Sequence, residues 1–237
     1  MVTRHGARVC QVDGRIGPDV PAWGMSPDLL ARIGKRWRGY CRSAGLDGMA
    51  EQAWKELERR YTEPHRAYHN LLHISECLTL LDETDIPPSW REALELALWY
   101  HDAVYDTRRH DNEEASAALA RQHLEPAGCP QERIARVEAL ILATKHHVAY
   151  GDPEAQLMVD IDLAIIGSNS VRFEEYEAQI RQEYAWVPDE DFRKGRAAVL
   201  EKFLGREQIY HTLTFHGIRE EMARHNLKRS LDALVKE

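Results

Sequence analysis

The sequence predicts an all-α protein, and three observations support that class. Apolar residues recur at helical spacing in almost every segment after residue 25. Neither repeated β–α–β alternation nor an Asn-Gly or Asp-Gly turn between alternating runs is present. Of the 237 residues, 43% are hydrophobic and 30% are charged, so the chain can bury a core. We therefore expect one helical domain, a bundle of roughly nine helices.

Residues 1–24 differ from the rest of the chain. They carry scattered glycine and proline and show no helical period. We expect a loose N-terminal extension here, with the helical domain over residues 25–237. The first helix then begins with Ser26 as its N-cap, Pro27 at its first position and Asp28 in its first turn.

The following helices are placed by their apolar faces and by the breakers between them. Residues 49–61 and 70–82 each keep a helical period. The sequence Pro87-Pro88-Ser89 breaks the chain and starts a strongly apolar helix over residues 90–105.

An alanine-rich helix with an acidic first turn is expected over residues 111–124, before the proline-bounded segment 126–130. The next apolar face spans residues 131–147, and a Gly-Asp-Pro turn then precedes a helix over residues 156–166. The last predicted helices span residues 170–186, 189–204 and 218 to the C-terminus.

Charge and composition exclude several classes of protein. With 31 basic and 39 acidic residues the net charge is −8, which disfavours binding to a nucleic-acid backbone. No window approaches the ~18 apolar residues of a membrane span, and no secretory signal is present. The four cysteines are irregularly spaced, so we expect reduced thiols in a cytoplasmic protein without membrane or nucleic-acid partners. A homodimer is left open.

Histidines and aspartates gather in four short segments. His69 and His73 are four residues apart and share one face of a helix. His101-Asp102 ends an apolar helix, and His146-His147 ends another. Asp160 and Asp162 lie in an apolar segment, where an ionised carboxylate is costly unless it is paired or binds a metal.

Imidazole and carboxylate ligands suit a borderline divalent ion such as Zn, Mn, Fe, Co or Ni, and Mg is kept as a further candidate. Two histidines and two aspartates would leave coordination positions for water and substrate. The bound water would be acidified and could attack phosphorus. The residue types therefore indicate a divalent metal site with open positions.

The order His73, His101-Asp102, Asp162 resembles the H…HD…D pattern of the HD superfamily of metal-dependent phosphohydrolases. Residues 68–73, YHNLLH, are also similar to the YHNxxH signature of the class I cyclic-nucleotide phosphodiesterases. The chain from about Met25 looks most like a bacterial subgroup of predicted HD phosphohydrolases. That likeness is carried by HRAYHNLLHI, WYHDAVYD, DNEEASA and the Arg-His-Asn-Leu stretch at 224–227. It implies an all-α fold and phosphoester hydrolysis with one or two ions, without naming a substrate.

The resemblance also implies roles for single residues. His73, His101, Asp102 and Asp162 would hold the metal, and His69 would donate a proton to the leaving oxygen. Asp160 would then orient a ligand or a water molecule.

Further candidates for a second metal or for substrate contact flank these residues. One residue of the pair His146 and His147 could bind the second ion or phosphate, with His146 slightly favoured. Their alternative is a favourable interaction with the end of a helix. Arg66 could bind phosphate through its fork of donors, or be an exposed helix-start charge. Asp106 and Glu113 could orient site residues, although Glu113 also suits an acidic first turn.

We therefore predict a cytoplasmic, metal-dependent phosphohydrolase with His69 and Asp102 as catalytic residues. Its substrate would be small, phosphorylated and nucleotide-like. The alternative is a catalytically silent HD module that binds a nucleotide or a partner protein for signalling.

Overall fold

The protein was analysed as a computed structural model that describes residues 26–236. Within this part of the chain the structure is all helical and contains no strand, which confirms the predicted fold class. It has ten α-helices and one 3₁₀ turn, where roughly nine helices were predicted. The predicted extension, residues 1–24, lies outside the described residues. The helices are α1 (Pro27–Ser43), α2 (Asp47–Tyr61), α3 (Leu71–Glu83), α4 (Pro88–Tyr100), α5 (Asn112–Leu124), α6 (Gln131–Thr144), α7 (Pro153–Asp162), α8 (Ser170–Glu183), α9 (Asp189–Leu204) and α10 (Leu213–Lys236), with η1 (Leu163–Ile165) after α7.

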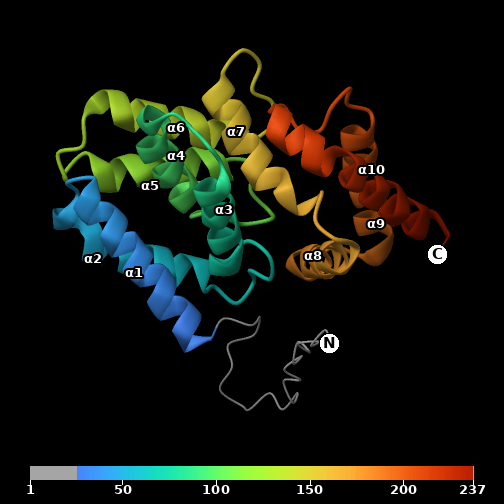
Figure 1. Cartoon of the computed structure of the whole chain (residues 1–237). Helices are drawn as coiled ribbons and strands as arrows, with labels where there is room; N and C mark the ends of the chain where they lie inside the picture. The colour runs from blue at the N-terminus through green and yellow to red at the C-terminus, as the bar shows by residue number, and fades with distance from the viewer. Residues whose placement is uncertain (1–25, 237) are drawn as a thin grey trace, which may run out of the picture.

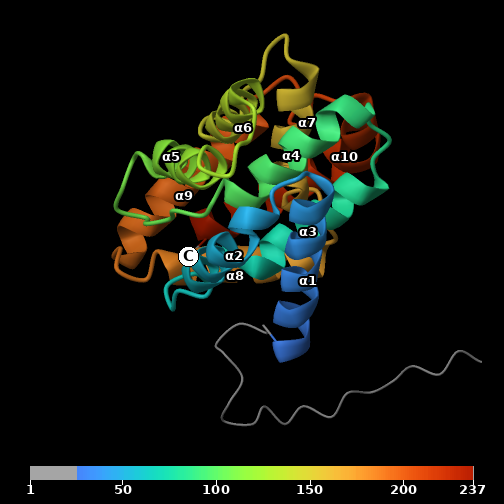
Figure 2. The same ribbon diagram turned by 90° about the vertical axis from the view of Figure 1, so that its left-hand side faces the viewer.

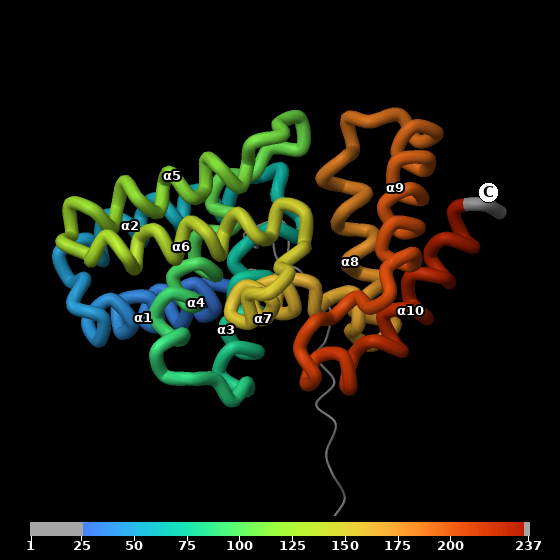
Figure 3. The backbone as a smooth tube through the Cα atoms, turned by 90° about the horizontal axis from the view of Figure 1, so that it is seen from above, coloured from blue at the N-terminus to red at the C-terminus, as the bar shows by residue number. Residues whose placement is uncertain are grey.

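The helices form two groups. Helices α1–α7, called the body below, surround the larger core, and α8–α10, called the C-terminal layer, lie together on one side (Figures 1 and 3). Figure 2 shows α5 and α6 side by side at one edge of the body. Among the described residues, no helix has both the length and the apolar character needed to cross a membrane.

Helix α4 forms the centre of the body. Every residue from Ala93 to Tyr100 is buried, and the ring of Trp99 packs edge-on against Trp37 of α1 at 5.3 Å between centroids. The start of α1 is as predicted, because the Ser26 hydroxyl accepts a hydrogen bond from the backbone N–H of Leu29. The core therefore fixes the carboxyl end of α4 in the interior of the molecule.

Four predicted helices end earlier than expected. Helix α8 ends at Glu183 rather than at residue 186. Beside the histidine and aspartate segments, α4 ends at Tyr100 rather than at residue 105, α6 ends at Thr144 rather than at 147, and α7 ends at Asp162 rather than at 166. In each case apolar residues continue past the helix end, so periodicity alone extends the element too far. The chain beyond these three ends carries His101-Asp102, His147 and the η1 turn.

Helix α10 begins at Leu213, five residues earlier than predicted, because Asp160 of α7 holds its start. The Asp160 carboxylate accepts hydrogen bonds from the backbone N–H groups of His211 and Thr212 at 2.8 and 2.7 Å, and from the Thr212 hydroxyl at 2.7 Å. Asp160 is fully buried. The structure thus gives Asp160 an anchoring role between α7 and α10, which corrects its prediction as a residue that orients a ligand or water.

The Arg-His-Asn-Leu stretch is also structural. Arg224 donates to the backbone carbonyls of Leu204 and Arg206, and the buried Asn226 amide donates to those of Ile166 and Ser168, both at 2.9 Å. The Arg224 bonds hold α10 against the end of α9, and the Asn226 bonds hold it against the turn after η1. A Cβ at Gly167 in this turn would lie 2.8 Å from the backbone oxygen of Arg219, so the close approach requires glycine.

Candidate metal centre

Four predicted ligands meet in one place: His73, His101, Asp102 and Asp162, called the His/Asp cluster below. Their donor atoms all lie within 4.8 Å of one another, and the cluster could hold a metal ion. The Nε2 atoms of His73 and His101 are 3.1 Å apart. Carboxylate oxygens of Asp102 and Asp162 lie 3.1–3.5 Å from these nitrogens.

These separations suit a divalent ion. An ion with ligands ~2.1 Å away separates neighbouring ligand atoms by roughly 3.0–3.4 Å. The ring orientation fits as well, because His101 Nδ1 donates to the backbone carbonyl of Leu98 at 3.0 Å. This bond leaves the lone pair on Nε2 directed to the cluster, as in metal-binding histidines. The donor set therefore fits the ion that the sequence predicted.

Helix ends position the four side chains. His73 lies in the first turn of α3, whose N-cap Asn70 accepts from the backbone N–H of Leu72. His101 and Asp102 directly follow α4, and Asp162 is the last residue of α7. Neighbouring residues of a regular helix cannot share a face, but the chain leaves α4 here. His101 and Asp102 can therefore face the same point.

Charges in the cluster shift the pKa values of its members. Burial lowers the pKa of the His101 imidazole, but the carboxylates of Asp102 and Asp162 outweigh this effect and raise it. Burial raises the pKa of both carboxyls, and the neighbouring imidazoles overcome this effect and hold them below their ordinary value. Ionised carboxylates in a partly buried site favour a bound cation.

His69 belongs to a second assembly, in which Glu183 at the end of α8 is the central residue. Glu183 Oε2 lies 2.6 Å from His69 Nδ1 and accepts from the Tyr105 hydroxyl at 2.8 Å. Its other oxygen accepts from the backbone N–H groups of Tyr68 and His69. The ring of Tyr105 stacks on His69 at 4.1 Å between centroids. His69 is thus held in one orientation, with its ring centroid 6.1 Å from that of His73.

His69 and Glu183 shift each other's pKa values. Burial raises the pKa of Glu183, but His69 and the two backbone N–H groups lower it to about 2. Burial lowers the pKa of His69, and the charges of Glu183 and Asp102 overcome this effect and raise it. Each member of the pair thus favours the charged form of the other.

Arg66 does not lie where a phosphate contact would need it. Its side chain is 0% exposed, and its guanidinium donates to the backbone carbonyls of His69, Asp102 and Ala103 and to the Glu63 carboxylate. It ties the loop before α3 to the turn after α4. The structure therefore supports neither of the two interpretations from the sequence, phosphate binding or an exposed charge.

Of the two neighbouring histidines, the sequence favoured His146 as a site residue, but the structure brings His147 to the cluster. His147 Nε2 lies 3.2 Å from Asp162 Oδ2, whereas the His146 side chain is exposed. The backbone of His147 has a φ of 51°, an uncommon value for a residue other than glycine, and its carbonyl accepts from Arg206. This turn directs His147, and not His146, to the cluster.

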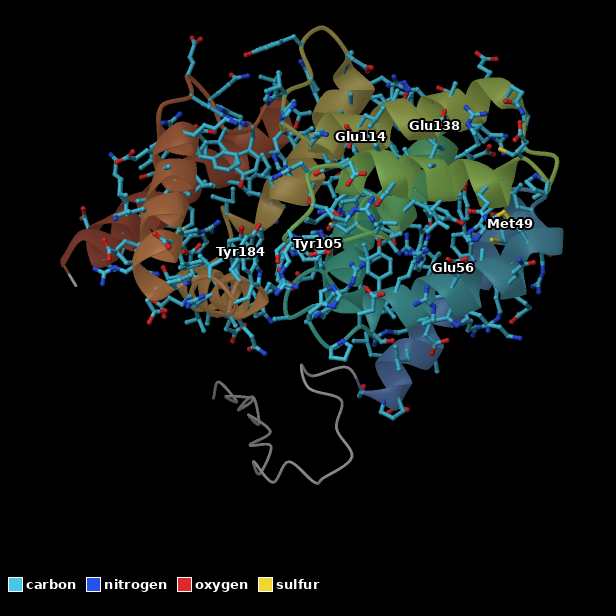
Figure 4. All side chains as sticks on the ribbon, turned by 180° about the vertical axis from the view of Figure 1, so that it is seen from behind. Met49, Glu56, Tyr105, Glu114, Glu138 and Tyr184 are labelled. Carbon is cyan, nitrogen blue, oxygen red and sulfur yellow. The ribbon has the colours of Figure 1, made fainter. Side chains whose placement is uncertain are left out.

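A cavity of about 260 Å³, called the His69 cavity below, opens beside the cluster. It is lined by His69, Asp102, Asp162, His147 and Glu113. Asp106 does not line it, since it caps its own loop by accepting from the backbone N–H of Arg108. Figure 4 labels Tyr105 of the body and Tyr184, just after α8, which both line the cavity.

A second cavity of about 300 Å³ touches His73 and Asp162 from the side of α3 and η1. Neither His69 nor Asp102 lines it. The predicted proton donor, His69, thus lines the His69 cavity and not this second one.

The sequence analysis missed Glu183, Tyr105 and the cavity wall supplied by α8 and α9. Glu183 lies in a polar-faced helix and carries no local signal of its partners, which are at least 78 residues away. Comparison with known proteins adds no further residue, because no family model, curated protein or solved structure matches the chain.

Proposed function

We propose that the protein is a metal-dependent phosphohydrolase of the HD type. The observation that carries the proposal is that His69, held by Glu183, lines the same cavity as Asp102 and Asp162 of the four-ligand His/Asp cluster. A divalent ion held by His73, His101, Asp102 and Asp162 would supply Lewis acidity and lower the pKa of water at its open positions. His147, whose Nε2 lies 3.2 Å from Asp162 Oδ2, would join Asp162 in contacting a second ion or the phosphate.

Hydrolysis forms a P–O bond from water and breaks the P–O bond to the leaving group. Glu183 occupies Nδ1 of His69, which leaves Nε2 as the ring atom that can donate. His69 would give its proton to the leaving oxygen, and the proton lost by water would pass to solvent. Glu183 favours the protonated imidazole before the transfer.

Metal analysis and a substrate panel test this function. The protein, purified without chelator, should contain about one or two equivalents of a divalent metal. It should turn over generic phosphoesters with Mn²⁺, Co²⁺, Ni²⁺ or Mg²⁺. A protein that takes up none of these metals contradicts the proposal. Metal binding without turnover on any phosphoester favours the alternative, a silent signalling module.

The role of His69 has its own test. The variant His69→Asn should lose roughly 100-fold in kcat on alkyl phosphates, whose leaving oxygen needs a proton. It should lose much less on p-nitrophenyl phosphate, whose leaving group departs unprotonated. Equal losses on both substrates would remove the proton-donor role.

We keep a cytoplasmic location within the proposal, because Cys41, Cys77 and Cys129 are buried and unpaired.

A further inference from the structure

We propose that the substrate carries a single phosphate on a compact, uncharged body that contains a ring, and that α8 and α9 bind this body. The inference rests on the proposed function, because it concerns the leaving-group side of the same cavity. By this inference the protein prefers phosphomonoesters of this kind over nucleoside di- and triphosphates and over dinucleotides.

Two helix faces form the wall of the His69 cavity that belongs to the C-terminal layer. Tyr176 and Ile180 of α8, with Tyr184 just after it, are spaced four residues apart. Val199 and Phe203 of α9 are also four apart and line the same cavity. Flat aromatic and aliphatic side chains of this kind bind a ring by stacking and by burial of apolar surface.

The cavity limits the size of this ring-bearing body. Its volume of about 260 Å³ lies just below the ~300–1,000 Å³ of pockets that hold drug-sized ligands. One end of the cavity is bounded by Asp102 and Asp162, where the phosphate would lie. The remaining space suits one ring system with a small linker, and not a second nucleotide.

The charges of the lining argue against further phosphates. Arg196 is the only lysine or arginine among the residues that line the cavity. Its guanidinium is paired with the Glu177 carboxylate and lies over the ring of Tyr176, at 5.3 Å from the centroid. Glu113 adds a negative charge to the lining.

Nearby arginines are engaged elsewhere. Arg66 donates to backbone carbonyls, and Arg206 donates to those of His146 and His147. A second or third phosphate would therefore bring negative charge into the cavity without an unpaired cation to receive it.

A matched substrate series tests the inference. We expect kcat/KM for a nucleoside 5′-monophosphate to exceed that for its di- and triphosphate by at least about tenfold. It should also exceed that for glycerol phosphate, which has no ring, by about tenfold. Equal or faster hydrolysis of the polyphosphates would overturn the proposal.

Two variants, with one control, test separately whether the wall of α9 binds the ring and whether the lack of positive charge excludes further phosphates. Phe203→Leu should lower kcat/KM about tenfold for the nucleoside monophosphate but little for glycerol phosphate. Phe215→Leu, a matched change at a buried position of α10 outside the cavity, should not alter this ratio. Val199→Arg, at a 41% exposed wall position, should shift the preference about tenfold toward the diphosphate. A loss with Phe203→Leu that is equal on both substrates contradicts binding of the ring by α9.

Binding measurements keep the two proposals distinguishable. If no phosphoester is turned over with any metal, the proposed function fails. Dissociation constants of the same mono-, di- and triphosphates, measured by calorimetry on the full chain with Mn²⁺, then decide the present inference. Tighter binding of the monophosphate supports it, and tighter binding of the triphosphate overturns it.

Discussion

The body and the C-terminal layer differ in burial and in the part of the site that each one builds. Helix α4 of the body buries every residue from Ala93 to Tyr100, whereas α9 of the layer buries only Leu200 and Phe203. All four members of the His/Asp cluster come from the body. The layer supplies a cavity wall and Glu183. Groups that need fixed geometry thus lie at the ends of well-buried helices, and groups that contact the substrate lie on a less buried layer.

Polar contacts join the two regions. Glu183 binds His69 and the backbone before it, and Arg172 of α8 pairs with Glu76 of α3 through two bonds of 2.9 and 3.0 Å. Asp160 holds the start of α10. Each contact can be removed separately, so the division of roles can be tested one residue at a time.

The largest effect is expected within the body. Asp162→Asn removes a charged ligand from the cluster, and we expect bound metal to be lost and turnover to fall by ~10³-fold. The melting temperature should be compared with that of the metal-free wild type, because loss of a bound metal lowers stability by itself. Metal analysis and activity on the same sample check this.

The matched control lies two residues earlier on the same helix. Asp160→Asn should keep its metal but lower the free energy of unfolding by about 2 kcal/mol, because buried N–H groups lose a charged acceptor. Loss of metal in this variant and not in Asp162→Asn would reverse the assignment of the two aspartates.

Arg66→Met should destabilise the body by about 3 kcal/mol. The change leaves the buried carbonyls of His69, Asp102 and Ala103 without their donor. Denaturant unfolding measures this loss. A raised KM with unchanged stability would instead support the phosphate contact that the sequence suggested.

Glu183→Gln tests the contact that links the two regions at the site. We expect kcat to fall about tenfold to 100-fold on alkyl phosphates, because His69 is oriented less well and is protonated less readily. The pKa of His69 falls without the Glu183 charge, so the alkaline limb of the pH–rate profile should move to lower pH. An unchanged profile argues against the pairing.

The same pair predicts how stability depends on pH. The pKa of Glu183 is lowered from an ordinary 4.5 to about 2, so its contribution is complete above pH 4.5 and is lost as pH falls toward 2. The pKa of His69 is raised above 6.5, so its contribution is present below pH 6.5 and is lost as pH rises. The difference in unfolding free energy between the wild type and Glu183→Gln should be largest between about pH 4.5 and 6.5.

The smallest effect is expected on the surface of the layer. Lys194 and Glu190 of α9 form a pair in which both side chains are at least 70% exposed. Lys194→Ala should change the free energy of unfolding by less than about 0.5 kcal/mol. A larger change would mean that α9 is more tightly integrated than its burial indicates.

Much of the fold could be predicted from the sequence, because apolar periodicity and caps such as Ser26 are local signals. The cluster could be predicted as well, since His73, His101-Asp102 and Asp162 stand in a recognisable order. Helix ends near the site were placed too late, because apolar residues continue past them. Arg66 was assigned incorrectly because its burial depends on the carbonyls of Asp102 and Ala103, which only the folded chain brings near.

The sequence separation of the Glu183 contacts has a consequence for how the protein folds. Glu183 meets the backbone of Tyr68 and His69 across more than a hundred residues, so closing this loop carries a large entropic cost. Neighbouring helices of the body, such as α5 and α6, pair with short connections and should form earlier. The His/Asp cluster also joins residues far apart in the sequence, since Asp162 of α7 meets His73 of α3. We therefore expect the cluster and the Glu183 contacts to be completed after the local pairing of helices such as α5 and α6.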